Sequence, residues 1–267
     1  MRKPISRTPE WLAPVGVVAG VALLVGVFLV IRYMNTPAPP RAIDSTSTTA
    51  VVAAITSLPA SELDQVGLGS ATNPIKRISG SLLTDSTGKP VVFYLGAEFC
   101  PFCAFERWGM IIALSRFGTF SGLQATTSSA TDAYPNTPTF TFRNATFTSH
   151  YIDFQPIETS DRNGSPLQSP TAAQQALLSR YDTSDAIPFV DFGNQYAFTG
   201  ATYTNPGILD GMSWSQIAAA LEQPGSAQAM AILGSANLIT AATCQLTGQQ
   251  PASVCSRAII QAIEAKL

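Results

Sequence analysis

The longest uncharged apolar run of the chain lies near its N-terminal end, at residues 15–31. Counted back to Leu12, the run holds about 20 residues, and a helix of that length spans about 30 Å, the thickness of a bilayer core. Trp11 and Tyr33 stand at its two edges, where aromatic side chains favour the membrane interface. The pattern predicts a single transmembrane helix over residues 12–33.

The charges on the two sides of this run predict its orientation. Three basic residues precede the core of the run and two follow it: Arg2, Lys3, Arg7, Arg32 and Arg41. This small excess favours a cytoplasmic location for residues 1–11 and an extracytoplasmic one for the bulk of the chain. A cleaved signal peptide and a buried core helix are the alternatives, although an apolar signal region is usually only about 7–15 residues long. We expect an uncleaved single-pass anchor in the cell membrane.

A change of composition separates this segment from the rest of the chain. Residues 34–49 are rich in Pro, Ser and Thr and nearly free of apolar side chains, which is typical of an extended, solvated linker. The chain becomes globular after it, so we expect one domain over residues 50–267. A short helix is expected over residues 51–56, with Thr48 or Thr49 as its cap.

The first strongly patterned part of the domain is a strand followed by a helix. A turn over residues 85–90 leads into the sequence VVFYL at 91–95, a continuous apolar run typical of a buried central strand. The motif Cys-Pro-Phe-Cys occupies residues 100–103, directly after that strand. Residues 104–117 follow helical spacing up to Gly118, so we expect a helix that buries one broad face.

The remaining pattern alternates strands and helices and ends in helices. Strands are expected at 139–143 and 147–154, joined around Asn144, and a helix capped by Thr171 follows the polar loop after them. A hairpin with Gly193 and Asn194 at its turn is expected next. Beyond residue 205 the spacing predicts helices at 213–221, 226–238 and 257–266. The class is therefore α/β, with a mixed central sheet and extra C-terminal helices.

Composition and cysteine spacing restrict the chemistry. The chain is 46% hydrophobic and 12% charged with a net charge of −2, and it has no basic patch, so a nucleic-acid partner is not expected. Its four cysteines form two close pairs, as an oxidising compartment tolerates. We expect Cys244 and Cys255 to form a structural disulfide, with free thiols or a second shuttling pair as the alternatives. A zinc site using both pairs is the alternative, but the single histidine, His150, has no companion, and we expect no metal and no cofactor beyond a redox-active Cys100–Cys103 pair.

The chemistry is expected at the Cys-Pro-Phe-Cys motif. A strand, a tight turn and a helix place Cys100 at the helix N-cap and Pro101 at the first helical position, where the missing N–H costs nothing. The Cys100 sulfur then faces unpaired N–H groups and the positive end of the helix dipole, which stabilise a thiolate. We therefore expect Cys100 to be a solvent-accessible nucleophile and Cys103, sheltered beneath it, to resolve mixed disulfides. An inert disulfide that staples the helix is the alternative.

The segment VVFYLGAEFCPFC at residues 91–103 resembles the core of thioredoxin-fold oxidoreductases, and CPFC is similar to the CPYC of glutaredoxins and the CPHC of DsbA-type oxidants. More narrowly, GAEFCPFC, followed by ERW at 106–108 and SRFGTFS at 115–121, is similar to an uncharacterised prokaryotic family, the domain of unknown function numbered 929. That family often carries an N-terminal membrane anchor. This narrower resemblance runs from about residue 50 to the C-terminus. The wider resemblance to thioredoxin-fold proteins covers only the motif, its strand and helix and one later proline, and it implies a thioredoxin-like fold.

The wider resemblance also implies a role for a later proline. In thioredoxin-fold proteins a cis-proline opens a strand opposite the cysteines, and its neighbour offers backbone hydrogen bonds to the substrate chain. The residues around Ile187 and Pro188 fit that pattern, with Pro156 as the second candidate. Because the interval between Cys103 and this proline is long, we expect an insertion at about residues 126–170.

Several other residues near the motif are candidates for tuning or binding. Glu98 is a candidate for adjusting the pKa of Cys100, although a solvated loop glutamate is the alternative. Phe99 and Phe102 flank the cysteines and are expected to contribute an apolar surface for substrate chains. Glu106 and Arg107 are expected to form a surface pair.

These features together predict an extracytoplasmic thiol–disulfide oxidoreductase that acts on protein thiols and disulfides. A quinone-linked or transmembrane partner near the anchor would recycle it. Two alternatives remain open: a copper(I)-binding metallochaperone, because thiolates favour that ion, and a non-catalytic scaffold whose insertion binds another protein.

Overall fold

The computed structural model describes residues 12–35, 45–203 and 205–267. The predicted cytoplasmic segment 1–11 and the linker residues 36–44 lie outside the described residues. The chain divides between Ala38 and Pro39 into two compact units, which are described separately.

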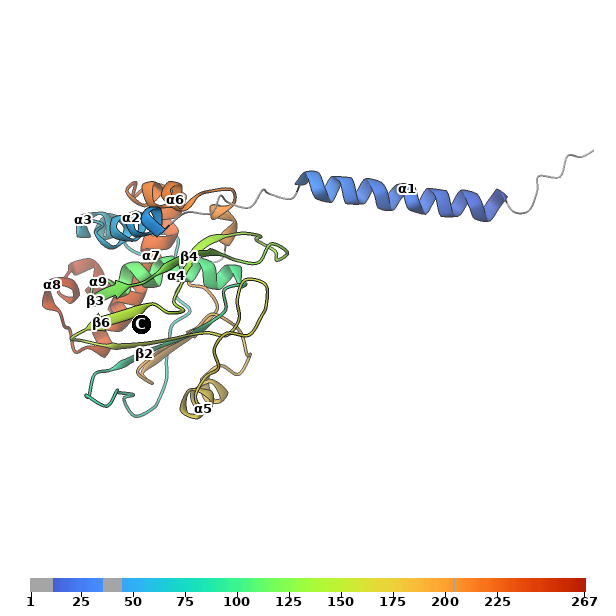
Figure 1. Cartoon of the computed structure of the whole chain (residues 1–267). Coiled ribbons are helices and arrows are strands. Elements are labelled where there is room, and N and C mark those ends of the chain that lie inside the picture. The colour runs from blue at the N-terminus through green and yellow to red at the C-terminus, as the bar shows by residue number, and fades with distance from the viewer. Residues whose placement is uncertain (1–11, 36–44, 204) are drawn as a thin grey trace, which may run out of the picture. The chain divides into compact units, whose positions relative to one another are not determined.

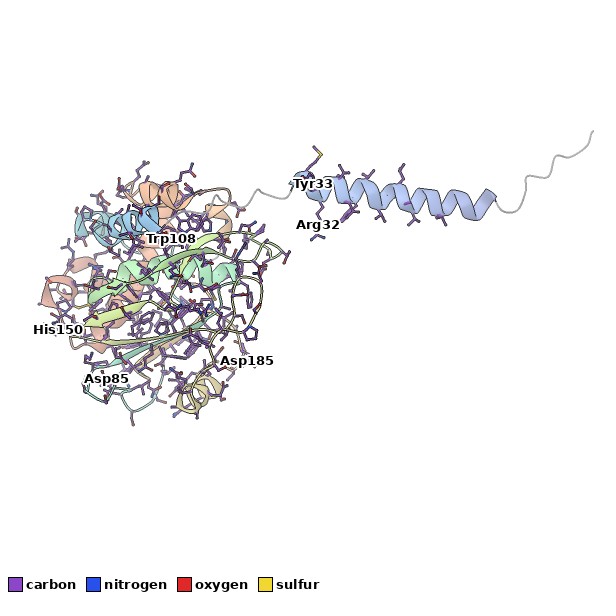
Figure 2. The ribbon with its side chains drawn as sticks, in the orientation of Figure 1. Arg32, Tyr33, Asp85, Trp108, His150 and Asp185 are labelled. Carbon is purple, nitrogen blue, oxygen red and sulfur yellow. A yellow bond between two sulfur atoms is a disulfide. The ribbon has the colours of Figure 1, made fainter. Side chains whose placement is uncertain are left out.

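The N-terminal unit contains helix α1 (Leu12–Asn35), with Arg32 and Tyr33 near its C-terminal end (Figures 1 and 2). Its large apolar side chains between Val18 and Ile31 are 49–70% exposed. Successive positions in a helix point in different directions, so this run presents apolar surface around the whole helix. Outside α1, Leu82 is the one exposed large hydrophobic residue among those described.

One helix of the described residues is long and apolar enough to cross a membrane by length and composition, and it is α7 (Ala227–Leu246) at the C-terminal end rather than the N-terminal run. Its apolar window is 89% buried inside the second unit. Burial of this kind is also what a core helix of a folded domain shows. In α1 the shorter stretch Gly20–Met34 is apolar.

The second unit is built on a five-stranded mixed sheet, so the predicted α/β class with a mixed sheet is confirmed. The strand order is β1-β9-β8-β2-β7, with β2 parallel to β7 and all other neighbours antiparallel. The five strands have the following bounds: β1 (Lys76–Arg77), β2 (Val91–Gly96), β7 (Asp153–Glu158), β8 (Phe189–Phe192) and β9 (Tyr196–Thr199).

Strand β2 lies between two hydrophobic clusters, as its continuous apolar sequence predicts. All six of its residues are buried. Val92 and Tyr94 belong to the larger cluster, whereas Val91, Phe93 and Leu95 belong to a smaller cluster on the other face. This alternation follows from the two-residue period of a strand.

Helices cover both faces of the sheet. Helices α4 (Pro101–Leu114) and α7 pack against one face, and α5 (Ala172–Tyr181) covers the other (Figure 1). The other helical elements have the following bounds: α2 (Ser45–Thr56), α3 (Ala60–Val66), the 3₁₀ turn η1 (Pro206–Leu209), α6 (Trp214–Leu221), α8 (Ala252–Cys255) and α9 (Ala258–Glu264).

Helix α4 is buried on all sides, and the expectation of a single buried face is wrong. Phe102 is its one residue that is not buried. The reason is that α7 packs on the side that faces away from the sheet. At Gly109 a Cβ atom would lie 2.3 Å from Ser235 Oγ, so the two helices approach closely where α4 has no side chain.

Two predicted boundaries differ from the structure. Helix α2 begins at Ser45, so the last part of the predicted linker 34–49 is helical; Thr48 is buried there, and Val51 and Ile55 join the main core. Packing of that apolar face, rather than the polar composition of the first turn, decides where the helix starts.

The predicted insertion at 126–170 is also too wide, because its strand β7 is the parallel partner of β2 in the central sheet. The strands outside that sheet form two small antiparallel pairs: β3 (Gly118–Ser121) with β6 (Thr146–Ser149), and β4 (Gln124–Thr127) with β5 (Pro138–Thr141). The two strands expected on either side of Asn144 are present as β5 and β6, but each pairs with an earlier strand rather than with the other.

Local signals elsewhere are confirmed. Gly193 and Asn194 both have φ of 60° in the three-residue turn between β8 and β9, a left-handed conformation that Gly and Asn adopt more readily than other residues. Thr171 caps α5 and forms a capping box with Gln174. Helix α7 is longer than its predicted range because its buried positions continue to Leu246.

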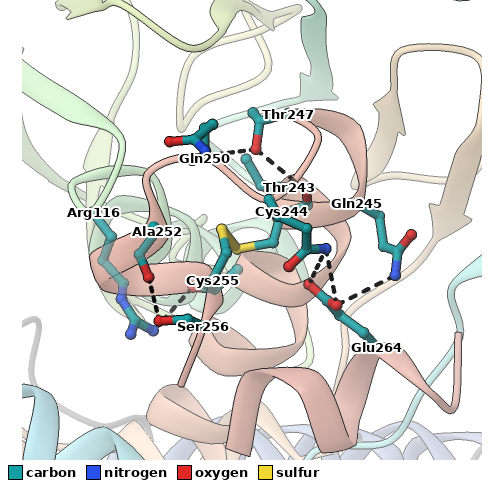
Figure 3. Close-up of a disulfide and its surroundings, with 12 residues drawn as sticks. Arg116, Thr243, Cys244, Gln245, Thr247, Gln250, Ala252, Cys255, Ser256 and Glu264 are labelled. Atoms are coloured by element: carbon teal, nitrogen blue, oxygen red, sulfur yellow. Dashed lines mark hydrogen bonds between the residues drawn. A yellow bond between two sulfur atoms is a disulfide. The ribbon is translucent and has the colours of Figure 1, made fainter. Parts of the chain in front are cut away.

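The predicted disulfide between Cys244 and Cys255 is confirmed (Figure 3). It joins the last turn of α7 to α8 across a loop in which the Gln250–Pro251 peptide bond is cis. Glu264 of α9 accepts hydrogen bonds from Gln245 and Gln249 beside it. The C-terminal helices are thereby linked to the core helix α7.

Removal of this disulfide should destabilise the domain. The cysteines are 11 residues apart, and closure of a loop of that size is worth about 3 kcal/mol in the chain-entropy account. We therefore expect the double variant Cys244→Ala/Cys255→Ala of the full chain in detergent to lose about 2–4 kcal/mol in urea unfolding. The two proteins should coincide under reducing conditions; an unchanged midpoint under oxidising conditions would contradict this expectation.

Candidate functional site

The Cys-Pro-Phe-Cys motif forms the start of α4, as the sequence predicts. Cys100 is the N-cap residue, with extended backbone angles of φ −75° and ψ 121°, and Pro101 occupies the first turn. The Cys103 N–H donates to the Cys100 sulfur over 3.2 Å. The sulfur therefore takes the place of the side-chain oxygen that normally accepts at a helix N-cap. Both cysteines are free thiols.

The two thiols differ in how far a reactant can reach them. Cys100 is 6% exposed and Cys103 is fully buried. The expectation of an openly accessible Cys100 therefore holds only in part, because a small area of this residue reaches solvent. If an external disulfide approaches the motif, Cys100 is the sulfur that it meets first.

A loop from the region between β4 and β5 packs against Phe99 and Phe102, next to the two cysteines. Ser129 N–H donates to the Phe99 carbonyl, and the ring of Tyr134 meets that of Phe102 edge-on at 6.0 Å between centroids. Phe99 also lines a groove of about 340 Å³ together with Arg162. Phe99 and Phe102 are both half-buried, so each contacts protein on one side and solvent on the other.

The segment before β8 lies against the same sulfur. The Cys100 thiol donates to the Ile187 carbonyl over 3.8 Å, and the Ile187–Pro188 peptide bond is cis. Pro188 is buried and its carbonyl accepts from Gly200 N–H. The second candidate, Pro156, lies within β7 opposite Tyr94. The structure thus brings together Cys100, Cys103, Ile187 and Pro188.

The electrostatics of the two thiols differ in the same sense as their exposure. The hydrogen bond with the Cys103 side chain lowers the pKa of Cys100, burial opposes this, and backbone N–H groups of the first turn lower the pKa further. Burial is the main cause that raises the pKa of Cys103 well above its usual range, and its hydrogen bond with Cys100 adds to this. Cys100 is therefore the thiol that ionises first.

A buried ion pair lies below the motif, and the expectation that Glu106 and Arg107 form a surface pair is wrong. Arg107 is fully buried and pairs with Glu158, with its Nε and Nη2 donating to the two carboxylate oxygens over 2.8 and 2.7 Å. Its Nη2 also donates to the Ala97 carbonyl over 2.7 Å. Burial acts to lower the pKa of Arg107, but the charge of Glu158, its hydrogen bonds and the neighbouring Tyr94 and Cys103 together raise the pKa well above its usual range.

Glu106 points the other way, into the interface between α4 and α7. It is fully buried and accepts from Thr202 N–H over 2.9 Å, from the Thr202 hydroxyl, and from the Ser235 hydroxyl over 3.2 Å. Burial raises the pKa of Glu106 to about 7, although these hydrogen bonds act to lower it. Glu106 and Arg107 are thus neighbours in sequence, but their side chains point to opposite sides of α4 and bind different partners.

The remaining predicted residues lie apart from this chemistry or at its edge. Glu98 is 8% exposed, its N–H donates to the Ser160 carbonyl, and its charge acts on the buried Glu158. His150 is exposed at the edge of the unit (Figure 2). Among the described residues, no three His, Cys, Asp or Glu side chains cluster as metal ligands would.

Sequence reasoning missed three residues beneath the motif. Tyr94 looks like an ordinary strand residue, and Glu158 lies near the end of a strand assigned to an insertion. Arg107 stands four positions after Cys103 and so shares its helix face, a spacing that offers the only signal of their association. Its partner is 51 residues away in sequence, and only the pairing of β2 with β7 brings the two together.

Comparison with known proteins gives one match. Residues 76–245 match the model of a family described as "Domain of unknown function (DUF929)". No curated protein and no solved structure matches the chain.

The buried Glu106 should make stability depend on pH. Its pKa is about 7 in the folded protein and 4.5 in its reference state, so the unfolded chain loses this proton at a lower pH than the folded one. Below pH about 4.5 Glu106 is protonated in both states and does not affect the free energy of unfolding. Between pH about 4.5 and 7 only the unfolded chain loses this proton, so the free energy of unfolding falls by up to about 3 kcal/mol. We expect the stability of Glu106→Gln relative to the wild type to rise by about that amount between pH 4 and 8.

Urea unfolding at a series of pH values measures this difference. The exposed Glu222 provides a matched control, because Glu222→Gln should follow the wild-type profile at every pH. A constant difference between Glu106→Gln and the wild type would show that Glu106 does not titrate in this range.

Proposed function

This chain belongs to the DUF929 family, and we propose that it is a membrane-anchored thiol–disulfide oxidoreductase acting on extracytoplasmic proteins. The observation that carries this proposal is the pairing of two unequal thiols at the start of one helix. Cys100 has a lowered pKa and some exposure, whereas Cys103 is buried with a raised pKa. Thiol–disulfide exchange requires one thiol that attacks the substrate disulfide and a second that later resolves the mixed disulfide.

The reaction follows from this inequality. The Cys100 thiolate attacks one sulfur of a substrate disulfide, a mixed disulfide forms, and the other substrate sulfur leaves as a thiolate. Cys103 then loses its proton and attacks the Cys100 sulfur, which releases the second substrate thiolate and leaves a Cys100–Cys103 disulfide. The substrate is reduced by two electrons and the enzyme is oxidised by two. With an oxidised enzyme the same steps run in reverse.

The Ile187 carbonyl supports a specific way of holding the substrate. It lies 3.8 Å from the Cys100 sulfur, so an extended chain bonded to that sulfur would run beside residues 187–188 and pair with their backbone. Phe99 and Phe102 would contact its side chains. We propose on this basis that β2, α4, β7, β8 and β9 form a thioredoxin-like arrangement, with Pro188 in the role that the resemblance implies.

The location proposed for this activity depends on α1. Ten large apolar side chains between Val18 and Ile31 are exposed in this helix, and such a continuous apolar surface is unfavourable in water. A helix of 24 residues is long enough to cross a bilayer core of about 30 Å. We propose that α1 is the anchor, with the second unit outside the cytoplasm and a membrane redox partner that recycles it.

Insulin reduction with dithiothreitol as the electron source tests the activity. The full chain in detergent should accelerate reduction, and Cys100→Ser should abolish the acceleration. Pre-reduced Cys103→Ser, mixed with insulin after the dithiothreitol has been removed, should trap a mixed disulfide that gel electrophoresis resolves. Cys244→Ala/Cys255→Ala, compared at a temperature where it remains folded, is the matched control and should retain activity. Equal rates for the wild type and Cys100→Ser would refute the proposal and favour a non-catalytic binding role.

A further inference from the structure

Two polar groups buried below the motif have no partner in the described part of the chain. They are Arg107 Nη1 and the Tyr94 hydroxyl, and both residues are fully buried. Buried donors without acceptors are rare and costly, so each one calls for an explanation. A Cβ atom on Gly96 would lie 2.1 Å from the Tyr94 oxygen, which places this hydroxyl against the backbone at the end of β2, four residues before Cys100.

The guanidinium of Arg107 is firmly held at all but one of its nitrogens. Nε and Nη2 bind Glu158, and Nη2 also binds the Ala97 carbonyl. The Ala97 carbonyl also accepts from Cys100 N–H. A hydrogen bond between the Ala97 backbone and the Cys103 sulfur acts to lower the pKa of Cys103. Arg107 is thus hydrogen-bonded to the turn that carries both sulfurs. Its Nη1 is a cationic donor with no hydrogen-bond acceptor among the described residues.

The charges around Cys103 come from few groups. Arg107 lies one helical turn further along the same face of α4, and its positive charge acts to lower the pKa of both cysteines. The negative charge of Glu158 of β7 opposes the positive charge of Arg107. The charge of Glu98, in the loop before the motif, acts to raise the pKa of Glu158. Burial raises the pKa of Tyr94 of β2 well above its usual range, so this group stays neutral. Glu106 faces α7 instead.

We propose that Arg107 is a positioning residue that stabilises the Cys103 thiolate as it forms, and that Glu158 sets how much of this positive charge the sulfur experiences. This inference rests on the proposed exchange function and concerns its second step. The effect is one of charge, because no hydrogen bond joins Arg107 to either sulfur in the dithiol form among the described contacts. A permanent cation suits this task, since it needs no proton of its own to act on an emerging anion.

The step that Arg107 assists is the resolution of a mixed disulfide. Cys103 S–H releases its proton to solvent, the Cys103 sulfur forms a bond to the Cys100 sulfur, and the bond from Cys100 to the substrate sulfur breaks. The substrate leaves as a thiolate with the electron pair of that bond. A buried thiol pays a desolvation cost when it ionises, and a buried cation nearby offsets part of that cost.

An aromatic disulfide, 5,5′-dithiobis(2-nitrobenzoate), separates this step from the first one in stopped-flow absorbance. Attack by Cys100 releases one coloured thiolate in a phase that depends on reagent concentration. Attack by Cys103 then releases a second thiolate in a first-order phase, which Cys103→Ser should lack. Below the pKa of Cys103, a lower pKa raises the thiolate fraction but also weakens the nucleophile, so the first-order rate changes about three- to fourfold for each unit of pKa.

Two variants of the full chain should shift this rate in opposite directions. Arg107→Met removes the cation, so we expect the first-order phase to slow by about threefold or more at fixed pH. Glu158→Gln removes the opposing charge and keeps a hydrogen-bond acceptor, so this phase should accelerate. A merely structural role would slow the phase in both variants, because both break the same buried pair.

A matched control comes from a second arginine in the same unit. Arg116 is half-buried and donates hydrogen bonds to Asn237 and Thr240 of α7, so Arg116→Met should leave the first-order phase unchanged. If Arg107→Met fails to fold, Glu158→Gln still tests the proposal. A first-order phase in Glu158→Gln that is unchanged or slower than in the wild type would overturn it. Absence of the concentration-dependent phase in the wild type would instead count against the exchange function itself.

Discussion

The hydrogen bond from Cys103 N–H to the Cys100 sulfur is the contact on which the rest of this site depends. It makes a sulfur the cap of α4. The pKa of that sulfur is lowered first by the hydrogen bond with the Cys103 side chain and further by the N–H groups of the first turn. The same short turn buries Cys103 completely. Two residues of the same type, three positions apart, therefore acquire opposite chemical character, and their difference comes from their positions at one helix end.

Close packing of α4 on every side explains why its polar residues are paired internally. The sheet lies on one side and α7 on the other, and the missing side chain at Gly109 lets the second helix approach. Charged groups enclosed in this way need partners, because an isolated buried charge is very unfavourable. Glu106 finds Thr202 and Ser235, and Arg107 finds Glu158. The interior of this domain is consequently more polar than its apolar composition indicates.

Two separate segments of the chain lie against the motif. The loop that contains Ser129 and Tyr134 shields Phe99 and Phe102, while Ile187 closes the opposite side of Cys100. Cys100, between these two segments, is 6% exposed. The segments come from parts of the chain that lie far apart in sequence.

Local signals in the amino-acid sequence were sufficient for the elements around the motif. The apolar run of β2, the N-cap position of Cys100, the hairpin at Gly193 and the pairing of Cys244 with Cys255 each depend on neighbouring residues or short loops. The α/β class and the family follow from the same signals. The start of α2 at Ser45, the place of β7 in the central sheet, the full burial of α4 and the Arg107–Glu158 pair had to come from the tertiary structure. These features arise from contacts between distant segments, and the hydrophobic period of one segment carries no information about which other segment will cover it.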